Sequence, residues 1–111
     1  MNRPALVVTR HRETDHLLRL EVVGEIDMAT ADHVYAVVEA TLAADHPTQL
    51  VIDLTAVTFL DCAGIRALIS AQRAASDRAT NLRVVGASRH IQRVLHLTGV
   101  QDLLAGTNPE L

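Results

Sequence analysis

Residues 50–69 read LVIDLTAVTFLDCAGIRALI and contain the strand and the helix that decide the fold. The segment 50–54 is short and almost continuously apolar, which is typical of a central strand covered on both faces. We predict a loop over residues 55–60, including Phe59 and Leu60. The apolar positions then take a helical spacing from Ile65 onward. A strand that passes into a helix in this way is the building unit of an α/β protein.

The flanking sequence repeats the same alternation of strands and helices. Residues 5–12 predict a weak first strand, and alternating apolar residues predict a second strand at Leu17–Ile26, with a bend near Gly24. A helix follows, with Thr30 as its N-cap, Asp32 in its first turn and His46-Pro47 at its end. Residues 82–85 predict the next strand, ended by Gly86, and residues 91–98 a short helix stopped by Gly99.

The predicted order is therefore β-β-α-β-α-β-α in one domain spanning residues 1–111. This order favours an α/β fold with a mixed, mostly parallel sheet of about four to five strands packed against helices. We expect residues 1–4 and about 105–111 to be loosely ordered. The residues that we expect to be largely buried are Val34, Val38, Leu50, Ile52, Leu54, Ile65, Leu68, Ile69, Val84, Val94 and Leu95.

Composition excludes several classes of function. Aromatic residues make up 2% of the 111 residues and the net charge is -3, so neither a base-stacking surface nor a basic patch for nucleic acid is present. No apolar run is long enough to span a membrane, and the first residues lack the form of a signal peptide. The single cysteine, Cys62, excludes an intramolecular disulfide. We expect a cytoplasmic domain that is a monomer or a weak dimer.

The six histidines are not spaced as metal ligands, and no nucleotide-binding glycine loop or hydrolase motif is present. We therefore expect no metal, no cofactor and no enzymatic activity. Arg73, Arg78, Arg89 and Arg93 are interpreted as solvent-facing charges.

The turn Asp61-Cys62-Ala63-Gly64 is the candidate functional segment. It precedes a helix and follows a strand, and α/β proteins usually bind ligands beyond the carboxyl ends of their strands. Asp61 is the candidate N-cap, and Gly64 would let the helix approach its neighbour closely. The free N–H groups and the helix dipole at this end favour a phosphate or a thiolate.

Three segments, taken in order, resemble the STAS domain: GEIDMATA at 24–31, VIDLTAVTFLDCAGIRAL at 51–68 and LTGV at 97–100. More narrowly, they are similar to the bacterial anti-sigma factor antagonists. The resemblance covers nearly the whole chain, and the middle segment is its most specific part. It implies a STAS fold and a partner-switching function. In that function the antagonist binds an anti-sigma factor, a serine kinase of the histidine-kinase-type ATPase superfamily, and a sigma factor is released.

The resemblance also implies which residues form the switch. In the family, phosphorylation of a serine directly after the aspartate of this turn breaks the contact with the anti-sigma factor. Cys62 occupies that position here, so a serine kinase has no hydroxyl to modify. Thr55 and Thr58 lie nearby in sequence and are candidate substitute acceptors, although threonines are also common in loops at strand ends. The residues expected to form the partner-binding turn are Asp27, Asp61, Cys62, Ala63, Gly64, Ile65 and Arg66.

Alternatives remain open at each of these positions. Cys62 is either a small, half-buried apolar residue or a modifiable, redox-sensitive thiol. Asp27 is either part of the switch or a capping carboxylate, and Arg66 faces outward as either a partner contact or a solvated charge. Two alternative functions also remain: an accessory STAS subunit of a membrane lipid transporter, and a STAS module that senses a small ligand or redox state.

Overall fold

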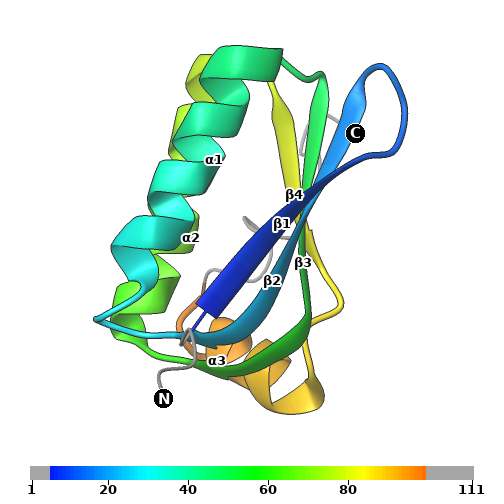
Figure 1. The fold of residues 1–111 in the computed structure, drawn as a ribbon. Helices are drawn as coiled ribbons and strands as arrows, with labels where there is room; N and C mark the ends of the chain where they lie inside the picture. The colour runs from blue at the N-terminus through cyan, green and yellow to red at the C-terminus, as the bar shows by residue number, and fades with distance from the viewer. Residues whose placement is uncertain (1–5, 100–111) are drawn as a thin grey trace.

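A computed structural model describes residues 6–99, and within them it has four strands and three helices in the predicted order (Figure 1). Residues 1–5 and 100–111 lie outside the described residues, and they include both segments that were expected to be loosely ordered. The elements are β1 (Leu6–Arg12), β2 (Leu17–Ile26), α1 (Ala31–Asp45), β3 (Gln49–Leu60), α2 (Cys62–Asp77), β4 (Asn81–Val85) and α3 (Arg89–Leu97).

The four strands form one sheet in the order β1-β2-β3-β4. β1 pairs antiparallel with β2, whereas β2–β3 and β3–β4 are parallel pairs, so the predicted mixed, mostly parallel sheet is confirmed. The two parallel connections contain α1 and α2. Both helices pack on one face of the sheet and run side by side, while α3 lies at one end of it (Figure 1). This placement follows because parallel crossovers share one handedness, and successive crossovers in one direction therefore fall on one face.

The core lies between this face of the sheet and the two helices, with Ile91 and Leu95 added by α3, and it is aliphatic as the composition requires. Alternate residues of β2 and β3 point into it, and eight of the eleven residues expected to be buried are buried. Ile69, Val84 and Val94 are only partly buried, which corrects the prediction for them. Val84 is on β4, which within residues 6–99 is an edge strand with no neighbouring strand on one side.

β3 is longer than predicted, because residues 55–60 continue the strand and do not form a loop. Past Asp53 the strand has lost its pairing with β4 but remains paired with β2, as far as Ile26 opposite Leu60. The register shifts twice in this stretch, near Glu21/Val23 and near Gly24/Glu25. Each shift interrupts the alternation of buried and exposed residues. The sequence pattern therefore resembled a loop although the backbone is extended.

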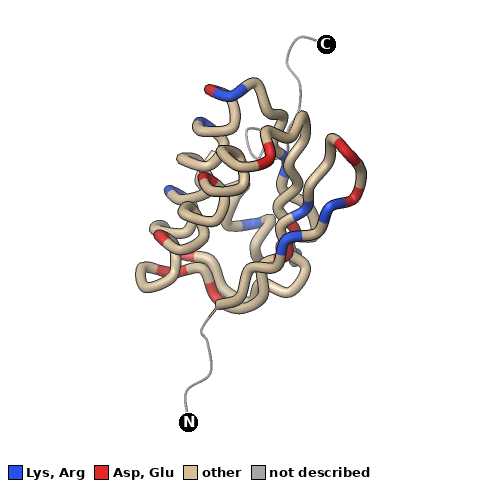
Figure 2. The backbone as a smooth tube through the Cα atoms, turned by 45° about the horizontal axis from the view of Figure 1, so that its top comes forward, with Lys and Arg blue, Asp and Glu red and all other residues tan. Residues whose placement is uncertain are grey.

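Other boundaries agree with the sequence. α1 ends at Asp45, followed by its C-cap His46 with the left-handed backbone angle φ 46°. α3 ends at Leu97, two residues before Gly99, which has φ 76°. Arg10 and Arg12 of β1 both bond to Asp45 at the end of α1, with N···O distances of 2.8 and 3.3 Å. Charges of both signs are spread over the helices and the sheet (Figure 2). No helix within residues 6–99 is long and apolar enough to cross a membrane.

Candidate functional site

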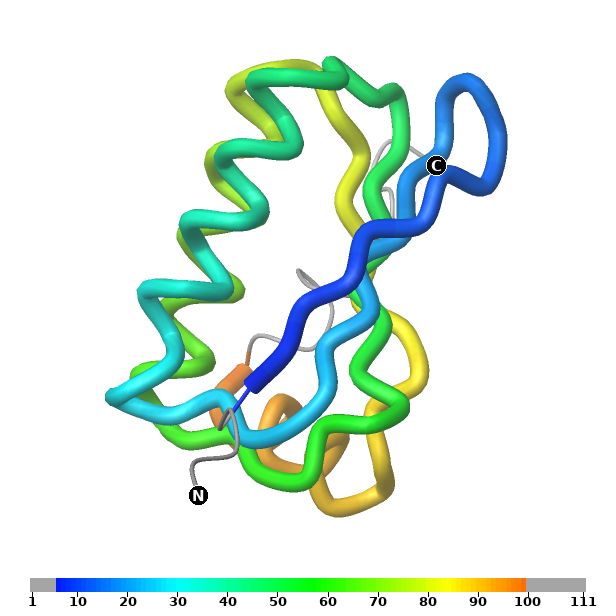
Figure 3. The backbone as a smooth tube through the Cα atoms, viewed as in Figure 1, coloured from blue at the N-terminus to red at the C-terminus, as the bar shows by residue number. Residues whose placement is uncertain are grey.

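The helices α1 and α2 begin at the same end of the molecule (Figure 3). α1 follows β2 after a short loop, and α2 follows β3 after one residue. This end is the carboxyl edge of a parallel strand pair, where α/β folds usually form their sites. The predicted switch residues lie in the two segments that pass from strand to helix there. The structure therefore brings the Asp27 segment and the Asp61 segment to one edge.

α2 begins as predicted, with Asp61 as its N-cap. The Asp61 backbone is extended, and its Oδ1 accepts a hydrogen bond from the backbone N–H of Gly64 at 3.0 Å. The Asp61 N–H donates to the backbone oxygen of Ile26 at 3.2 Å. That bond ties the start of α2 to the end of β2. The carboxylate satisfies one of the N–H groups that the first turn of a helix leaves free.

Gly64 is required by close packing between α2 and the sheet. A Cβ atom at this position would lie 2.5 Å from Leu60 Cδ1 and 2.6 Å from the backbone oxygen of Ile26. Real side chains do not tolerate such distances, so only glycine lets the first turn of α2 come this near to the strand ends. The predicted role of Gly64 is confirmed.

Cys62 is the first residue of α2 and its side chain is exposed. The interpretation of Cys62 as a half-buried apolar residue is therefore wrong. Ile65 points into the core at 6% exposure, and Ala63 is half-buried. Arg66 is exposed, as the helical spacing predicted. The turn thus presents Cys62 and Arg66 outward while Gly64 and Ile65 hold it against the sheet.

The start of α1 is built differently from the prediction. Thr30 occupies the N-cap position, but its hydroxyl makes no cap bond to the helix. The hydroxyl donates to the backbone oxygen of Glu25 at 2.7 Å and accepts from the Asp27 N–H at 2.9 Å. Asp27 Oδ1 accepts the N–H groups of Ala29 and Thr30 at 2.9 and 3.2 Å. The Asp27 carboxylate therefore acts as a capping group in this segment.

Thr55 and Thr58 lie in β3, and the structure separates Thr55 from the turn. Five residues of extended chain lie between Thr55 and Asp61, so the two are about 20 Å apart along the strand. The Thr55 hydroxyl donates to the Asp53 carboxylate at 2.6 Å. Thr58 is nearer to the turn, is exposed, and donates a long bond of 3.4 Å to the Gly24 backbone oxygen.

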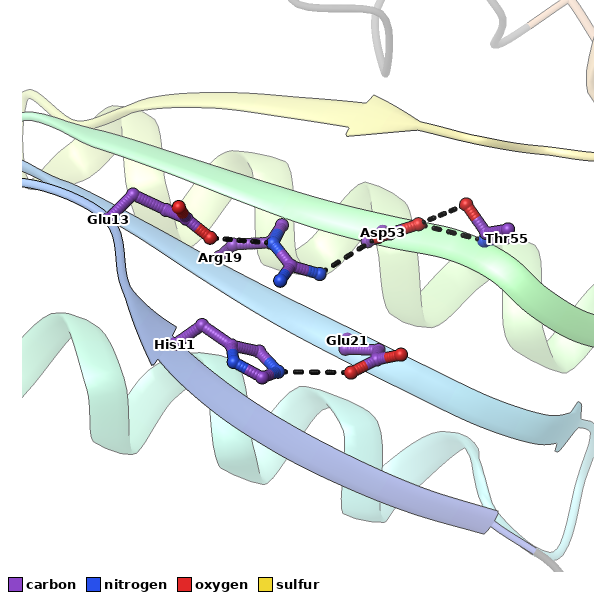
Figure 4. A network of polar contacts seen from close by, with 6 residues as sticks. All are labelled: His11, Glu13, Arg19, Glu21, Asp53 and Thr55. Atoms are coloured by element: carbon purple, nitrogen blue, oxygen red, sulfur yellow. Dashed lines mark hydrogen bonds and ion pairs between the residues drawn. The ribbon is translucent and has the colours of Figure 1, made fainter.

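Thr55 belongs to a network on the sheet face opposite α1 and α2 (Figure 4). Arg19 joins Glu13 at 2.8 Å and Asp53 at 3.0 Å, and a separate contact joins His11 to Glu21. Hydrogen bonds from Thr55, together with Arg19, lower the pKa of the Asp53 carboxyl below its usual value. Hydrogen bonding to Glu13 raises the pKa of Arg19. The Arg19–Asp53 pair links β2 to β3, and the His11–Glu21 contact links β1 to β2.

Sequence reasoning missed a groove between α1 and α2. Near the helix starts it widens into a hollow of about 650 Å³ lined by Met28, Tyr35, Ala63 and Arg66, among others. A second hollow of about 450 Å³ continues it along the helices and shares Tyr35. Met28 is 82% exposed. The sequence carries no signal for this groove, because its lining comes from two helices and the loop before α1.

Among residues 6–99, no three His, Cys, Asp or Glu side chains are grouped so that they could hold a metal ion. Within that range the histidines are exposed, except for His11, which is partly buried and contacts Glu21. Arg73, Arg78, Arg89 and Arg93 are exposed as predicted, and Arg78 pairs with Glu39 at 3.2 Å.

Comparisons with known proteins agree with the fold. The family model for the STAS domain matches residues 8–111. The anti-sigma-B factor antagonist of Listeria monocytogenes is 32% identical over 101 residues, covering 91% of this chain and 87% of that protein. The anti-sigma-F factor antagonist RsfB of Mycobacterium tuberculosis is 30% identical over 100 residues, covering 90% and 80%. A crystal structure of an anti-sigma factor antagonist from Mycobacterium paratuberculosis superposes with a TM-score of 0.77 at 31% identity, covering 92% of this chain and 86% of that one.

Proposed function

Because this chain belongs to the STAS domain family, we propose that it is an anti-sigma factor antagonist that binds its anti-sigma factor through the start of α2. Its relatives of about 30% identity are antagonists of this kind, and they align over most of their own length. The proposed partner is an anti-sigma factor with a kinase-type ATPase fold. The sigma factor is released when the antagonist occupies that partner.

The exposed Cys62 at the first position of α2 is the observation that carries the proposal. A side chain that protrudes from a rigid turn is available to a partner, whereas its neighbours Gly64 and Ile65 are buried. The Asp61 cap and the bond to Ile26 hold the turn in place. A docking surface of this kind needs little reorganisation before it binds.

The missing hydroxyl at position 62 changes how such an antagonist is controlled. A phosphoryl group adds about -1.5 to -2 charges, which oppose close packing against a partner. Cys62 cannot receive one from a serine kinase. We infer that the protein competes for its partner constitutively and that its cellular amount sets its effect.

A titration of three proteins against the purified anti-sigma factor tests the proposed interface. Cys62→Asp should weaken binding by about 2–5 kcal/mol, because it places an unpaired charge inside the interface beside Asp61. Cys62→Ser should bind as the wild type does. Ser76→Asp adds the same charge near the other end of α2 and should leave the affinity within about twofold of wild type.

Circular dichroism of each variant serves as the folding control for this titration. Equal affinities for the wild type and Cys62→Asp would remove the turn from the interface. That result would favour the two alternative functions, a transporter subunit or a ligand sensor.

Incubation with the partner kinase and ATP, followed by intact-mass analysis, tests the proposed loss of control. We expect no mass gain for the wild type and a gain of about 80 Da, one phosphoryl group, for Cys62→Ser. A wild-type gain that maps to Cys62 would contradict the proposal.

A mass gain of the wild type that maps to a threonine would show that the phosphorylation switch lies at another residue. Thr58 is the better substitute acceptor, because it is exposed and only weakly hydrogen-bonded. The Thr55 hydroxyl is bound to the Asp53 carboxylate, and a phosphoryl group there would meet that carboxylate's like charge. Thr58→Val should abolish a threonine signal that Thr55→Val leaves in place.

A further inference from the structure

The outer face of α1 and α2 carries charges in a repeated arrangement. Asp32 and Glu39 lie on α1, seven residues apart, and Arg66 and Arg73 lie on α2, also seven residues apart. Asp32 and Arg66 line the hollow near the helix starts, whereas Glu39 and Arg73 line the second hollow. We call Asp32 and Glu39 the acidic wall of this face, and Arg66 and Arg73 the basic wall. In each wall the two charged residues are about 10 Å apart along the helix.

These charges are largely unused within the described residues. No ion pair joins Asp32, Arg66 or Arg73 to another side chain in residues 6–99. Glu39 pairs with Arg78 at 3.2 Å. A carboxylate can accept a second arginine, as Asp45 does with the two arginines of β1.

We propose that this face is a self-association surface on which a second copy of the chain packs. Because α1 and α2 begin at the same end and run in the same direction, a two-fold axis parallel to them lays α1 of each copy over α2 of the other. Asp32 of one copy then contacts Arg66 of the other. Seven residues further along the helices, Glu39 of one copy contacts Arg73 of the other. Each contact occurs twice, as a two-fold interface requires.

The middle of the face suits such packing. Its floor includes Ala63, Ala67 and Tyr35, and the 82% exposed Met28 lies at one end. Short alanine side chains let helices approach closely. The exposed side chain of Met28 would be buried against the second copy. The groove residues carry arginines and carboxylates in equal number, so two copies bring no excess of one sign together.

The association should be weak and dependent on concentration. Two helices about 10 Å wide and about 22 Å long give a footprint of about 440 Å², below the roughly 800 Å² per partner of a standard interface. Exposed ion pairs add modestly to affinity and are screened by salt.

The self-association has a consequence for partner binding, and this consequence rests on the proposed function. Ala63 and Arg66 belong both to the groove and to the turn that carries Cys62. A second copy on this face would cover the side of the turn that faces the groove. Self-association and anti-sigma factor binding then exclude each other, so the free concentration of antagonist is buffered without phosphorylation.

Charge exchange tests the proposed pairing without any partner protein. The double variant Asp32→Lys/Glu39→Lys makes both walls basic. The double variant Arg66→Glu/Arg73→Glu makes both walls acidic. Sedimentation velocity at low ionic strength should show association of the wild type, and at least about tenfold weaker association for each variant alone. An equimolar mixture of the two variants should associate within about threefold of wild type, because every contact is then complementary.

The matched control is Arg83→Glu/Arg89→Glu, which makes the same charge change at exposed positions on β4 and α3. It should associate as the wild type does. A wild type that stays monomeric to about 1 mM, a charge variant that associates normally, or a mixture that stays monomeric would each overturn the proposal. None of these results depends on the anti-sigma factor.

The rate of thiol labelling tests whether the second copy covers the turn. Labelling of the exposed Cys62 by a maleimide should slow as the wild-type concentration rises through the association range. It should not slow for Asp32→Lys/Glu39→Lys. Labelling that is independent of concentration while the wild type associates would overturn mutual exclusion and leave the titration of the anti-sigma factor unaffected.

Discussion

The two helices that start at the carboxyl edge of the sheet are anchored in different ways. The segment before α1 is closed on itself, because the Asp27 carboxylate and the Thr30 hydroxyl bond to backbone groups of residues 25–30. The start of α2 has one side-chain cap, from Asp61, and is held chiefly by the contact of Gly64 with the sheet.

The difference shows how one edge can combine rigidity with an open surface. Before α1, the side chains of Asp27 and Thr30 are hydrogen-bonded within the turn, and Thr30 is 8% exposed. At α2 the anchoring groups lie on the inner side of the turn, so Cys62 and Arg66 remain exposed. Stability and partner binding therefore depend on different residues of the same turn.

Gly64→Val should have the largest effect on stability. A Cβ here would lie 2.6 Å from the Ile26 backbone oxygen, and backbone cannot move aside as a flexible side chain can. We expect a loss of about 3 kcal/mol or more in the free energy of unfolding, measured by urea denaturation. Ala43→Val, at an exposed position of α1, gives the intrinsic cost of valine in a helix, below about 1 kcal/mol. Similar losses for both variants would mean that packing does not anchor α2.

Thr30→Val should cost about 1–3 kcal/mol, because it leaves the Glu25 oxygen and the Asp27 N–H without their hydroxyl partner. Valine keeps the shape of threonine, so the change isolates the hydrogen bonds. Thr58→Val is the control, since that hydroxyl is exposed and makes one long bond, and it should change stability by less than about 0.5 kcal/mol. If Thr30→Val were equally mild, the closed hydrogen-bond network at α1 would not be what stabilises it.

Asp61→Ala should cost about 1 kcal/mol through the lost cap to the Gly64 N–H. Asp15→Ala, in the exposed turn between β1 and β2, removes the same charge without removing a cap and should be nearly neutral. Chemical denaturation of both variants gives the comparison. A loss for Asp61→Ala as large as that for Gly64→Val would reverse the assignment of packing as the main anchor of α2.

Cys62→Ala should have the smallest effect on stability, below about 0.5 kcal/mol, because the thiol is exposed and supports no packing. Thermal unfolding measures it against wild type. A loss greater than about 1 kcal/mol would show that the thiol is a structural group and that the turn does not separate stability from binding.

Much of this edge was predictable from local sequence. Asp61 and Gly64 were identified because a cap and a close approach have short-range requirements at a helix start, and both were confirmed. The exposure of Arg66 followed from helical spacing. Cys62 could not be placed in the same way, since the exposure of a first helical residue depends on how the turn sits against β2.

The sequence by itself determined the order of the elements, the mostly parallel sheet and most of the buried residues, because these follow from periodicities within short segments. The tertiary structure alone decided the extension of β3 to Leu60, since pairing with β2 continues across two register shifts that hide the alternation. It also decided that the Thr30 hydroxyl bonds back to Glu25. It placed Asp32 and Glu39 of α1 on a common groove with Arg66 and Arg73 of α2. Each of these depends on segments that become neighbours only when the helices pack on the sheet.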